Sequence, residues 1–314
     1  INLREAKRNA LLVLIDDKAV LDLENYVVDL QTQMDNEGAG NLLFPVSISQ
    51  NAGNLNSKIS ASNFIRLHEE KGNKKKIDAL IPFFTHELCR MLYGKPRLSE
   101  TNLSDGRGAP IKLFISHAKQ DGVSIAKALK AKVDADSGMN TFFDEIDIAP
   151  ASLWKEELDK GVKFSALLVI QTDAYSSREW CRWEVLKAKK YNRPVVVVNA
   201  VKEAEERSFP YLGNVPTIRW QDRRDKKKLI AKILNFTLYE ILRFIYTYEF
   251  LNSRPGLYGI TGHYKPSQKI LASPPELLTL LEKATEETTK GKVVVYPDPP
   301  LTAEELELLR EIND

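Results

Sequence analysis

The chain has 314 residues, enough for about two domains. Its 45 lysines and arginines nearly balance its 43 aspartates and glutamates, and this near-neutral net charge gives no indication of a nucleic-acid partner. Its two cysteines, Cys89 and Cys181, lie far apart and its histidines number four, so the sequence supplies neither a disulfide framework nor a set of metal ligands. The scattered cysteines favour a reduced, cytoplasmic setting. No apolar run is long enough to cross a bilayer, so we expect no membrane contact.

The first segment of the chain alternates apolar runs with helical patterns. The runs are rich in leucine, valine and isoleucine, which is typical of buried strands, and the last pattern has apolar residues at helical spacing. The expected elements are strands at Ala10–Asp16, Leu42–Ile48 and Asn63–Leu67 and helices near Leu23–Asn36 and at Ile77–Gly94.

A longer series of the same kind follows. Each of its strands is a near-continuous apolar run, which predicts a parallel sheet with helices on both faces. The expected strands are Ile111–Ser116, Met139–Asp144, Ala166–Asp173, Pro194–Val201 and Thr217–Trp220, and the expected helices are Asp121–Asp136, Leu153–Lys160, one from Ser176 and Lys232–Phe250.

The two segments share short sequences in the same order. ALLVL at Ala10–Leu14 matches ALLVI at Ala166–Ile170, KKKI at Lys74–Ile77 matches KKKL at Lys226–Leu229, and three further matches lie between and after them. Such ordered matches at a near-constant offset predict a duplication. The first segment would then be the second half of a domain, and we expect the chain to be a fragment or a processed product.

These patterns divide the chain into five parts. Two polar, turn-rich stretches are predicted to be linkers, and the final part has signals for two helices and one strand. There, Ser273 precedes two prolines, Lys292–Tyr296 is apolar, and Thr302 with Glu305 fits a capping box. We expect this short αβα tail either to pack on the repeat or to begin a further domain. The predicted parts are 1–94, linker 95–110, domain 111–250, linker 251–269 and tail 270–314.

The stretch SSREWCRWEV, Ser176–Val185, follows a buried strand directly. Ser176 and Glu179 fit a helix-capping box. Trp180 and Glu184 are four residues apart, which predicts that they share one helix face. An acid beside an aromatic residue, just past the end of an apolar strand, is where an open α/β sheet places a ligand crevice. Taken alone, however, these residues favour a core tryptophan and a solvated acid.

Three boxes in the second segment together resemble a Toll/interleukin-1 receptor (TIR) domain. They are KLFISHAKQD at Lys112–Asp121, FFDEIDIAPASLW at Phe142–Trp154, and the WCxxE box within Ser176–Val185. The resemblance, to the bacterial NAD-cleaving type, implies a flavodoxin-like α/β fold with a parallel sheet of about five strands. Through the repeat, residues 1–94 resemble a degenerate TIR half-domain.

In NAD-cleaving TIR domains the glutamate of the WCxxE box is catalytic, and it corresponds to Glu184. Breaking the nicotinamide–ribose bond leaves oxocarbenium-like charge on the ribose carbon, which a fixed carboxylate stabilises. Nicotinamide leaves as a neutral base, so neither metal nor cofactor is required. The resemblance implies NAD as the substrate and nicotinamide plus ADP-ribose, or a cyclic ADP-ribose, as products.

The same resemblance implies a set of substrate-binding residues around the ends of the first two strands. Lys119 would meet phosphate, although a solvated lysine is the more common situation for any single lysine. His117 stands where the family often has an aromatic residue, which leaves base stacking at that position open. The expected substrate-binding residues are Ser116, His117, Lys119, Phe143, Asp144 and Trp180.

The repeat offers an internal control for the catalytic assignment. Aligning Ala10 with Ala166 places Val28 opposite Glu184 and Glu24 opposite Trp180, so the first copy is expected to be non-catalytic. The main hypothesis is therefore an NAD glycohydrolase of immune or antiviral defence that is activated by homo-oligomerisation. The alternative is a non-catalytic TIR scaffold that assembles in signalling through the same BB loop, Asp144–Ser152.

Overall fold

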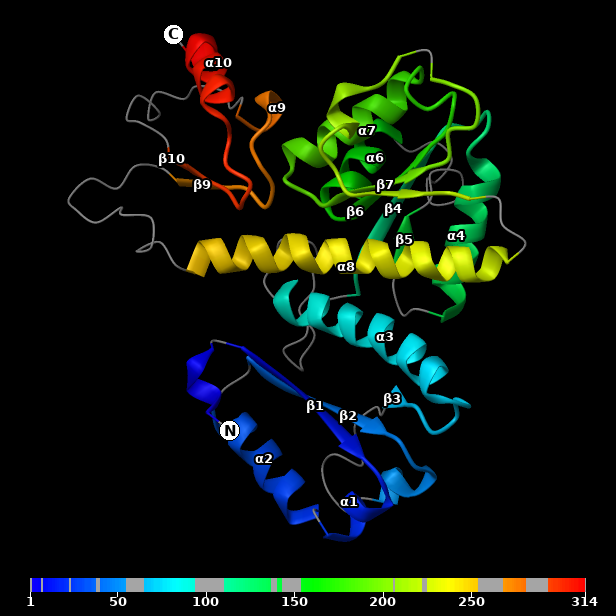
Figure 1. The fold of residues 1–314 in the computed structure, drawn as a ribbon, viewed down its shortest axis with the longest axis vertical. Coiled ribbons are helices and arrows are strands. Elements are labelled where there is room, and N and C mark those ends of the chain that lie inside the picture. The colour runs from blue at the N-terminus through cyan, green and yellow to red at the C-terminus, as the bar shows by residue number, and fades with distance from the viewer. Residues whose placement is uncertain are drawn as a thin grey trace, which may run out of the picture. The chain divides into compact units, whose positions relative to one another are not determined.

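The computed structural model describes the chain in twelve stretches, which form two compact units, Ile1–Ala109 and Pro110–Asp314. Figure 1 labels most of the helices and strands of each unit. The described residues are 2–6, 8–22, 24–37, 40–54, 65–93, 110–136, 140–142, 154–205, 207–221, 225–253, 268–280 and 293–313.

The first unit contains a three-stranded parallel sheet in the order β1-β2-β3. Strand β1 pairs with β2 in parallel along its whole length, and β2 continues to β3. Helix α2 packs on one face of this sheet through Leu30 and Met34, whereas Leu80 of α3 packs on the other. The elements are η1 Leu3–Glu5, β1 Asn9–Ile15, α1 Asp17–Asp22, α2 Glu24–Asn36, β2 Asn41–Ser47, η2 Gln50–Asn54, β3 Ile65–Arg66 and α3 Asn73–Tyr93.

Two helical regions of this unit differ in the structure from the helices predicted from the sequence. The helix expected near Leu23–Asn36 is preceded by a separate short helix, α1. Helix α3 begins at Asn73 and contains Pro82 in its interior. Proline is tolerated best in a first helical turn, and the sequence-based start at Ile77 placed Pro82 nearer the first turn than it is.

The second unit contains the complete five-stranded sheet, in the order β5-β4-β6-β7-β8 with every pairing parallel. The second strand in the chain lies outside the first, and the remaining strands follow on the other side, which is the flavodoxin-like order. The predicted α/β class and parallel sheet of about five strands are therefore confirmed. The elements are β4 Lys112–His117, α4 Val123–Asp136, β5 Asn140–Phe142, α6 Trp154–Lys163, β6 Ala166–Gln171, α7 Glu179–Lys190, β7 Val195–Asn199, η3 Pro210–Leu212, β8 Thr217–Arg219 and α8 Lys226–Ser253.

Alternation along the strands decides which side chains meet which helices. Phe114 of β4 belongs to one buried cluster with residues of α6 and α7, among them Leu158 and Val185. Side chains two residues apart on a strand point to the same face. Ser116 therefore lies on the α7 face of β4, and Ile115 and His117 lie on the opposite face.

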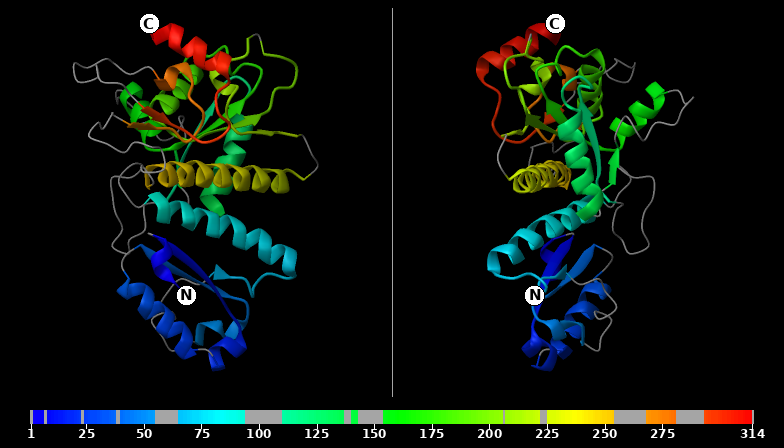
Figure 2. Two further views of the ribbon diagram at one scale, coloured as in Figure 1. Left: turned by 60° about the vertical axis from the view of Figure 1, so that its left-hand side comes forward. Right: turned by 90° about the vertical axis from the view of Figure 1, so that its right-hand side faces the viewer.

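The opposite face is covered by α4 and α8, which contact each other and the sheet. Helix α8 is one long helix that runs along this face in the views of Figures 1 and 2. Its buried residues recur at helical spacing from Leu229 to Leu251. It extends three residues past the boundary expected at Phe250.

The tail has one strand more than expected. Strand β9, Gln268–Ile270, begins inside the stretch assigned to a linker and pairs in parallel with β10, Val293–Val295. The expected helix, strand and helix of the tail are all present as α9, β10 and α10, and β9 is an additional strand that was not predicted. Its three residues, one of them a lysine, carry almost no periodic signal.

The two helix caps expected in the tail have different outcomes. The cap expected at Ser273 is wrong, because helix α9 is Leu277–Leu280. The capping box before α10, Ala303–Asn313, is confirmed: Thr302 N donates to Glu305 Oε2 at 2.8 Å and Glu305 N to Thr302 Oγ1 at 3.2 Å.

The central strand β6 should contribute most to the stability of the second unit. Leu168 is fully buried, so Leu168→Ala should lower the free energy of unfolding by about 2–5 kcal/mol. All four tryptophans lie in this unit, so their fluorescence during denaturant unfolding reports on it. The matched control is Leu308→Ala, because Leu308 is 60% exposed and its removal should cost less than about 0.5 kcal/mol. Equal losses for the two variants would contradict the assignment of the core.

Candidate functional site

The candidate site lies where strands β4 and β6 end. Ser116 is the next-to-last residue of β4 and is 1% exposed. Parallel strands end at the same edge of the sheet, and in this fold class the crevice outside that edge holds ligands. Ser116 is therefore placed by the strand both at the edge where this fold class binds ligands and toward helix α7.

Glu184 of α7 reaches this serine. Its side chain is buried, with the residue only 5% exposed, and Ser116 Oγ donates a hydrogen bond to Glu184 Oε2. A buried carboxylate needs such a partner, because desolvation without compensation is costly. The structure thus brings together the predicted catalytic residue and one of the predicted substrate-binding residues.

Tyr175 completes the cluster from the loop after β6. Its hydroxyl lies 2.6 Å from Ser116 Oγ and 3.3 Å from the carbonyl oxygen of Cys181, and its side chain is fully buried. Ser116 has one hydroxyl proton, which it donates to Glu184. In the short contact with Tyr175 the tyrosine hydroxyl is therefore the donor and Ser116 Oγ is the acceptor. The hydroxyls of Tyr175 and Ser116 form a chain that ends on the carboxylate.

The electrostatics of the cluster keep this tyrosine neutral. Burial raises the pKa of Tyr175 well above its usual value of 10, and the nearby Cys181 and Glu184 raise it further, while the hydrogen bond to Ser116 opposes the shift. Tyr175 is therefore a proton donor throughout the physiological pH range. Sequence reasoning missed this residue, although an aromatic among small polar residues directly after a buried strand was an available signal.

Asp121 fixes the loop that carries Tyr175. Its carboxylate accepts hydrogen bonds from Thr172 Oγ1 at 2.6 Å and from Ala174 N at 3.0 Å. A charged acceptor makes both bonds stronger than neutral ones. Next to it, Gly122 lies where a side chain would be crowded, because a Cβ there would lie 3.1 Å from the Ala118 carbonyl oxygen. The turns after β4 and β6 are thus tied together beside the cluster.

Helix α7 begins later than predicted. Its first residue is Glu179 and its N-cap is Arg178, which makes no side-chain cap. Ser176 Oγ instead donates to Glu205 Oε1 at 2.5 Å, and its carbonyl accepts from Arg182 at 2.8 Å. The capping box predicted from Ser176 and Glu179 is wrong, because a carboxylate 29 residues further along takes the serine hydroxyl.

The remaining predicted site residues are less closely associated with the cluster. Trp180 is 38% exposed and packs edge-on against Trp183 at 5.8 Å, so it differs from buried Glu184 one turn later. His117 is 8% exposed and contacts the Ile115 carbonyl at 3.3 Å on the other face of β4. Lys119 is exposed. Phe143, Asp144 and the BB loop lie outside the described residues.

The corresponding helix of the first unit buries no acid at the aligned positions. Val28, which the alignment places opposite Glu184, is half-buried, and Glu24, opposite Trp180, is also half-buried. Asp29, the acid that a one-residue shift would bring into register, is exposed. The carboxylate–serine contact is thus described for the second unit alone.

Two further properties concern the described stretches as a whole. They contain no group of three or more histidine, cysteine, aspartate or glutamate residues that could hold a metal ion. Within the same stretches no helix is both long and apolar enough to span a membrane.

Residues 113–234 match the family model of the TIR domain, and the comparison with curated proteins gave no match. Solved structures that match include the TIR domains of the activated Roq1 resistosome, which directly recognises the pathogen effector XopQ. The identity to them is 17%, the match covers 41% of this chain and 84% of that chain, and the TM-score is 0.27. The family model and the order of the five-stranded parallel sheet together identify residues 113–234 as a TIR domain.

Proposed function

We propose that the TIR domain is an NAD glycohydrolase in which Glu184 is the catalytic residue. The observation that carries this proposal is the buried contact between Glu184 and Ser116 at the ligand-binding edge of the sheet. A fold that needed only a packed helix would place an apolar side chain there. A carboxylate held at this edge by a hydroxyl fits a reaction that develops positive charge on a sugar.

The proposed reaction breaks the bond between ribose C1′ and the nicotinamide nitrogen. The bonding electron pair leaves with the nicotinamide, which becomes a neutral base, and C1′ becomes oxocarbenium-like. The Glu184 carboxylate stabilises this charge directly or through the ribose hydroxyls. Water then adds to C1′ and loses a proton to give ADP-ribose, or an adenine nitrogen adds to give a cyclic product.

The neighbouring hydroxyls orient this carboxylate. Ser116 donates its proton to Oε2, and the Tyr175 hydroxyl donates in turn to the Ser116 oxygen. When a ribose hydroxyl takes the place of Ser116, the carboxylate exchanges one hydrogen bond for another at small cost. We assign the contact with the rest of NAD to His117, Lys119, Phe143, Asp144 and Trp180, as the resemblance implies.

We further propose that residues 1–94 form a non-catalytic TIR-like half-domain. Support comes from the strand ends: Ile48 N donates to Ile15 O at 3.0 Å after β2, and Ala200 N donates to Gln171 O at 2.7 Å after β7. Both units therefore continue the ladder between their paired strands by one bond in the same way.

The TIR domain would act in immune defence in the cytoplasm after homo-oligomerisation through TIR–TIR contacts. The alternative function, a scaffold that assembles without turnover, uses the same fold. It differs in requiring no carboxylate at position 184, so the buried Glu184 favours the enzyme.

Replacing the proposed catalytic carboxylate separates these functions. Glu184→Gln keeps the shape and the hydrogen bond to Ser116 but removes the charge, and it should lower nicotinamide release from NAD by at least about 10²-fold. The full chain should be assayed alone and under enforced oligomerisation, with Glu179→Gln as the control, since Glu179 is exposed on the same helix. Equal turnover by wild type and Glu184→Gln, or none by wild type when oligomerised, would leave the scaffold as the function.

The role of Tyr175 has its own test. Tyr175→Phe removes the hydroxyl beside Ser116, so the free energy of unfolding should fall by about 1–2 kcal/mol. Turnover should fall roughly tenfold, since ~1.4 kcal/mol of lost transition-state stabilisation corresponds to that factor. The control is Tyr239→Phe, because Tyr239 is 59% exposed on α8. If both variants release nicotinamide at the wild-type rate, Tyr175 does not orient the site.

A further inference from the structure

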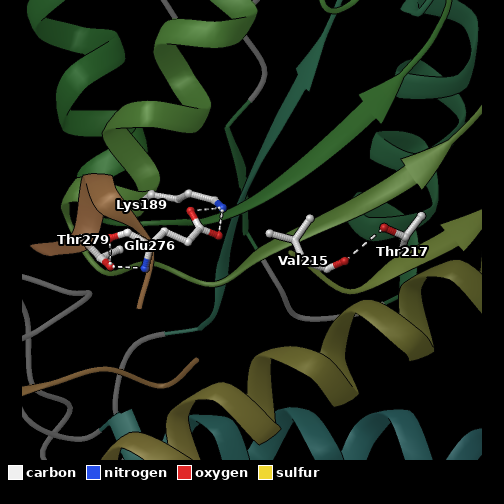
Figure 3. Close-up of polar contacts among 5 residues, drawn as sticks. All are labelled: Lys189, Val215, Thr217, Glu276 and Thr279. Carbon is white, nitrogen blue, oxygen red and sulfur yellow. Dashed lines mark hydrogen bonds and ion pairs between the residues drawn. The ribbon is translucent and has the colours of Figure 1, made fainter. Parts of the chain in front are cut away.

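The segment after helix α8 forms a buried ion pair with helix α7. Lys189 Nζ contacts both carboxylate oxygens of Glu276, at 2.5 and 2.7 Å. The two side chains are 7% and 18% exposed. Figure 3 shows the lysine reaching from α7 to the carboxylate. This ion pair between a buried lysine and a partly buried glutamate links two segments that are 87 residues apart in sequence.

Glu276 is presented by a rigid turn. Its backbone N–H donates to Thr279 Oγ1 at 2.8 Å, and the Thr279 hydroxyl donates to the Glu276 carbonyl oxygen at 2.8 Å. Figure 3 shows these bonds beside the ion pair. Because the backbone on both sides of the carboxylate is fixed, little conformational freedom is lost when the carboxylate meets Lys189.

A second attachment lies just beyond the end of α7. Asn192 has a positive φ of 51°, and its side-chain amide donates to the Ile270 carbonyl oxygen of β9 at 3.4 Å. The next residue, Leu271, is 3% exposed and donates from its backbone to the Val295 carbonyl oxygen at 2.9 Å. The β9–β10 pair is therefore connected to the same end of α7 as Glu276.

Because Lys189 is buried, its ammonium group depends on the Glu276 carboxylate for charge compensation. Burial lowers the pKa of Lys189, and the carboxylate of Glu276 opposes the shift. Tyr211 contributes its ring at 5.9 Å from Lys189 Nζ. Removing Glu276 would leave the ammonium group buried without its carboxylate, and such a charge would force the helix end or the tail to move.

We propose that residues 268–280 are a strap that holds helix α7, with Lys189 and Glu276 as positioning residues for Glu184. Glu184 precedes Lys189 by five residues, about 7.5 Å along the helix axis. A helix moves as a stiff body over this distance, so displacement of its end changes the contact between Glu184 and Ser116. The catalytic consequence rests on the proposed function, whereas the hold on the helix does not.

The test uses the full chain in four variants. Glu276→Gln and Lys189→Met each remove one charge of the pair, and Lys189→Met with Glu276→Leu replaces the pair by packed apolar side chains. Lys190→Met is the matched control, because Lys190 is exposed on the same turn. Hydrogen exchange is measured in α7, β9 and β10, and nicotinamide release is measured as kcat and KM separately.

Each single variant should exchange faster in β9, in β10 and in the C-terminal half of α7. Its kcat should fall about tenfold with KM within about twofold of wild type, because positioning of the carboxylate is lost rather than binding. The double variant should restore both readouts, since an apolar pair of similar volume keeps the segments packed. The control variant should leave both unchanged.

Unchanged exchange in the single variants would overturn the strap. Faster exchange in β9 and β10 with unchanged α7 and unchanged kcat would overturn the positioning role. If wild type releases no nicotinamide, the proposed function fails by itself, and the exchange in α7 still decides whether the strap holds the helix.

Discussion

The TIR domain depends on one buried polar contact, the hydrogen bond from Ser116 to Glu184. A carboxylate removed from water costs several kcal/mol unless a donor meets it. The donor must therefore lie on the α7 face of β4, at the carboxyl end of the strand. Helix α7 must in turn cross the sheet so that Glu184 faces this donor. The alternation of β4 and the orientation of α7 are therefore both constrained by this one contact.

The surrounding hydrogen bonds extend the constraint to the loops. Asp121 ties the turn after β4 to the loop after β6, and this loop places the Tyr175 hydroxyl within hydrogen-bond distance of Ser116. The serine is thus held between a neutral phenol and a carboxylate. Such a chain favours one orientation of each hydroxyl, because Ser116 donates to Glu184 and the Tyr175 hydroxyl lies closer to Ser116 Oγ than to the Cys181 carbonyl oxygen. A site ordered in this way before substrate arrives loses little entropy on binding.

Much of this arrangement could be predicted from the sequence, and the rest has identifiable reasons. The strands of the main sheet were predictable because each is a short apolar run whose pattern is local. The start of α7 was not, because the partner of Ser176 is Glu205, far along the chain. Strand β9 has three residues and is defined only by pairing with β10. The expectation that Ser116 and Glu184 lie together came from the TIR resemblance, whereas Tyr175 belongs to no quoted box.

Helices α2 and α7 differ in the buried side chains that they place against their sheets, and Glu184 is the main difference. Helix α2 buries Val27, Leu30 and Met34, a spacing of three and four residues that suits a helix on a sheet. Helix α7 buries Cys181, Glu184 and Ala188 at the same spacing. At the middle position of this buried spacing α2 has Leu30, which the sequence alignment does not place opposite Glu184, and α7 has a carboxylate that must be satisfied by Ser116. A leucine would stabilise the packing without any partner, so the fold alone gives no reason for the acid. Such a departure from local consistency is expected where a residue serves chemistry instead of stability.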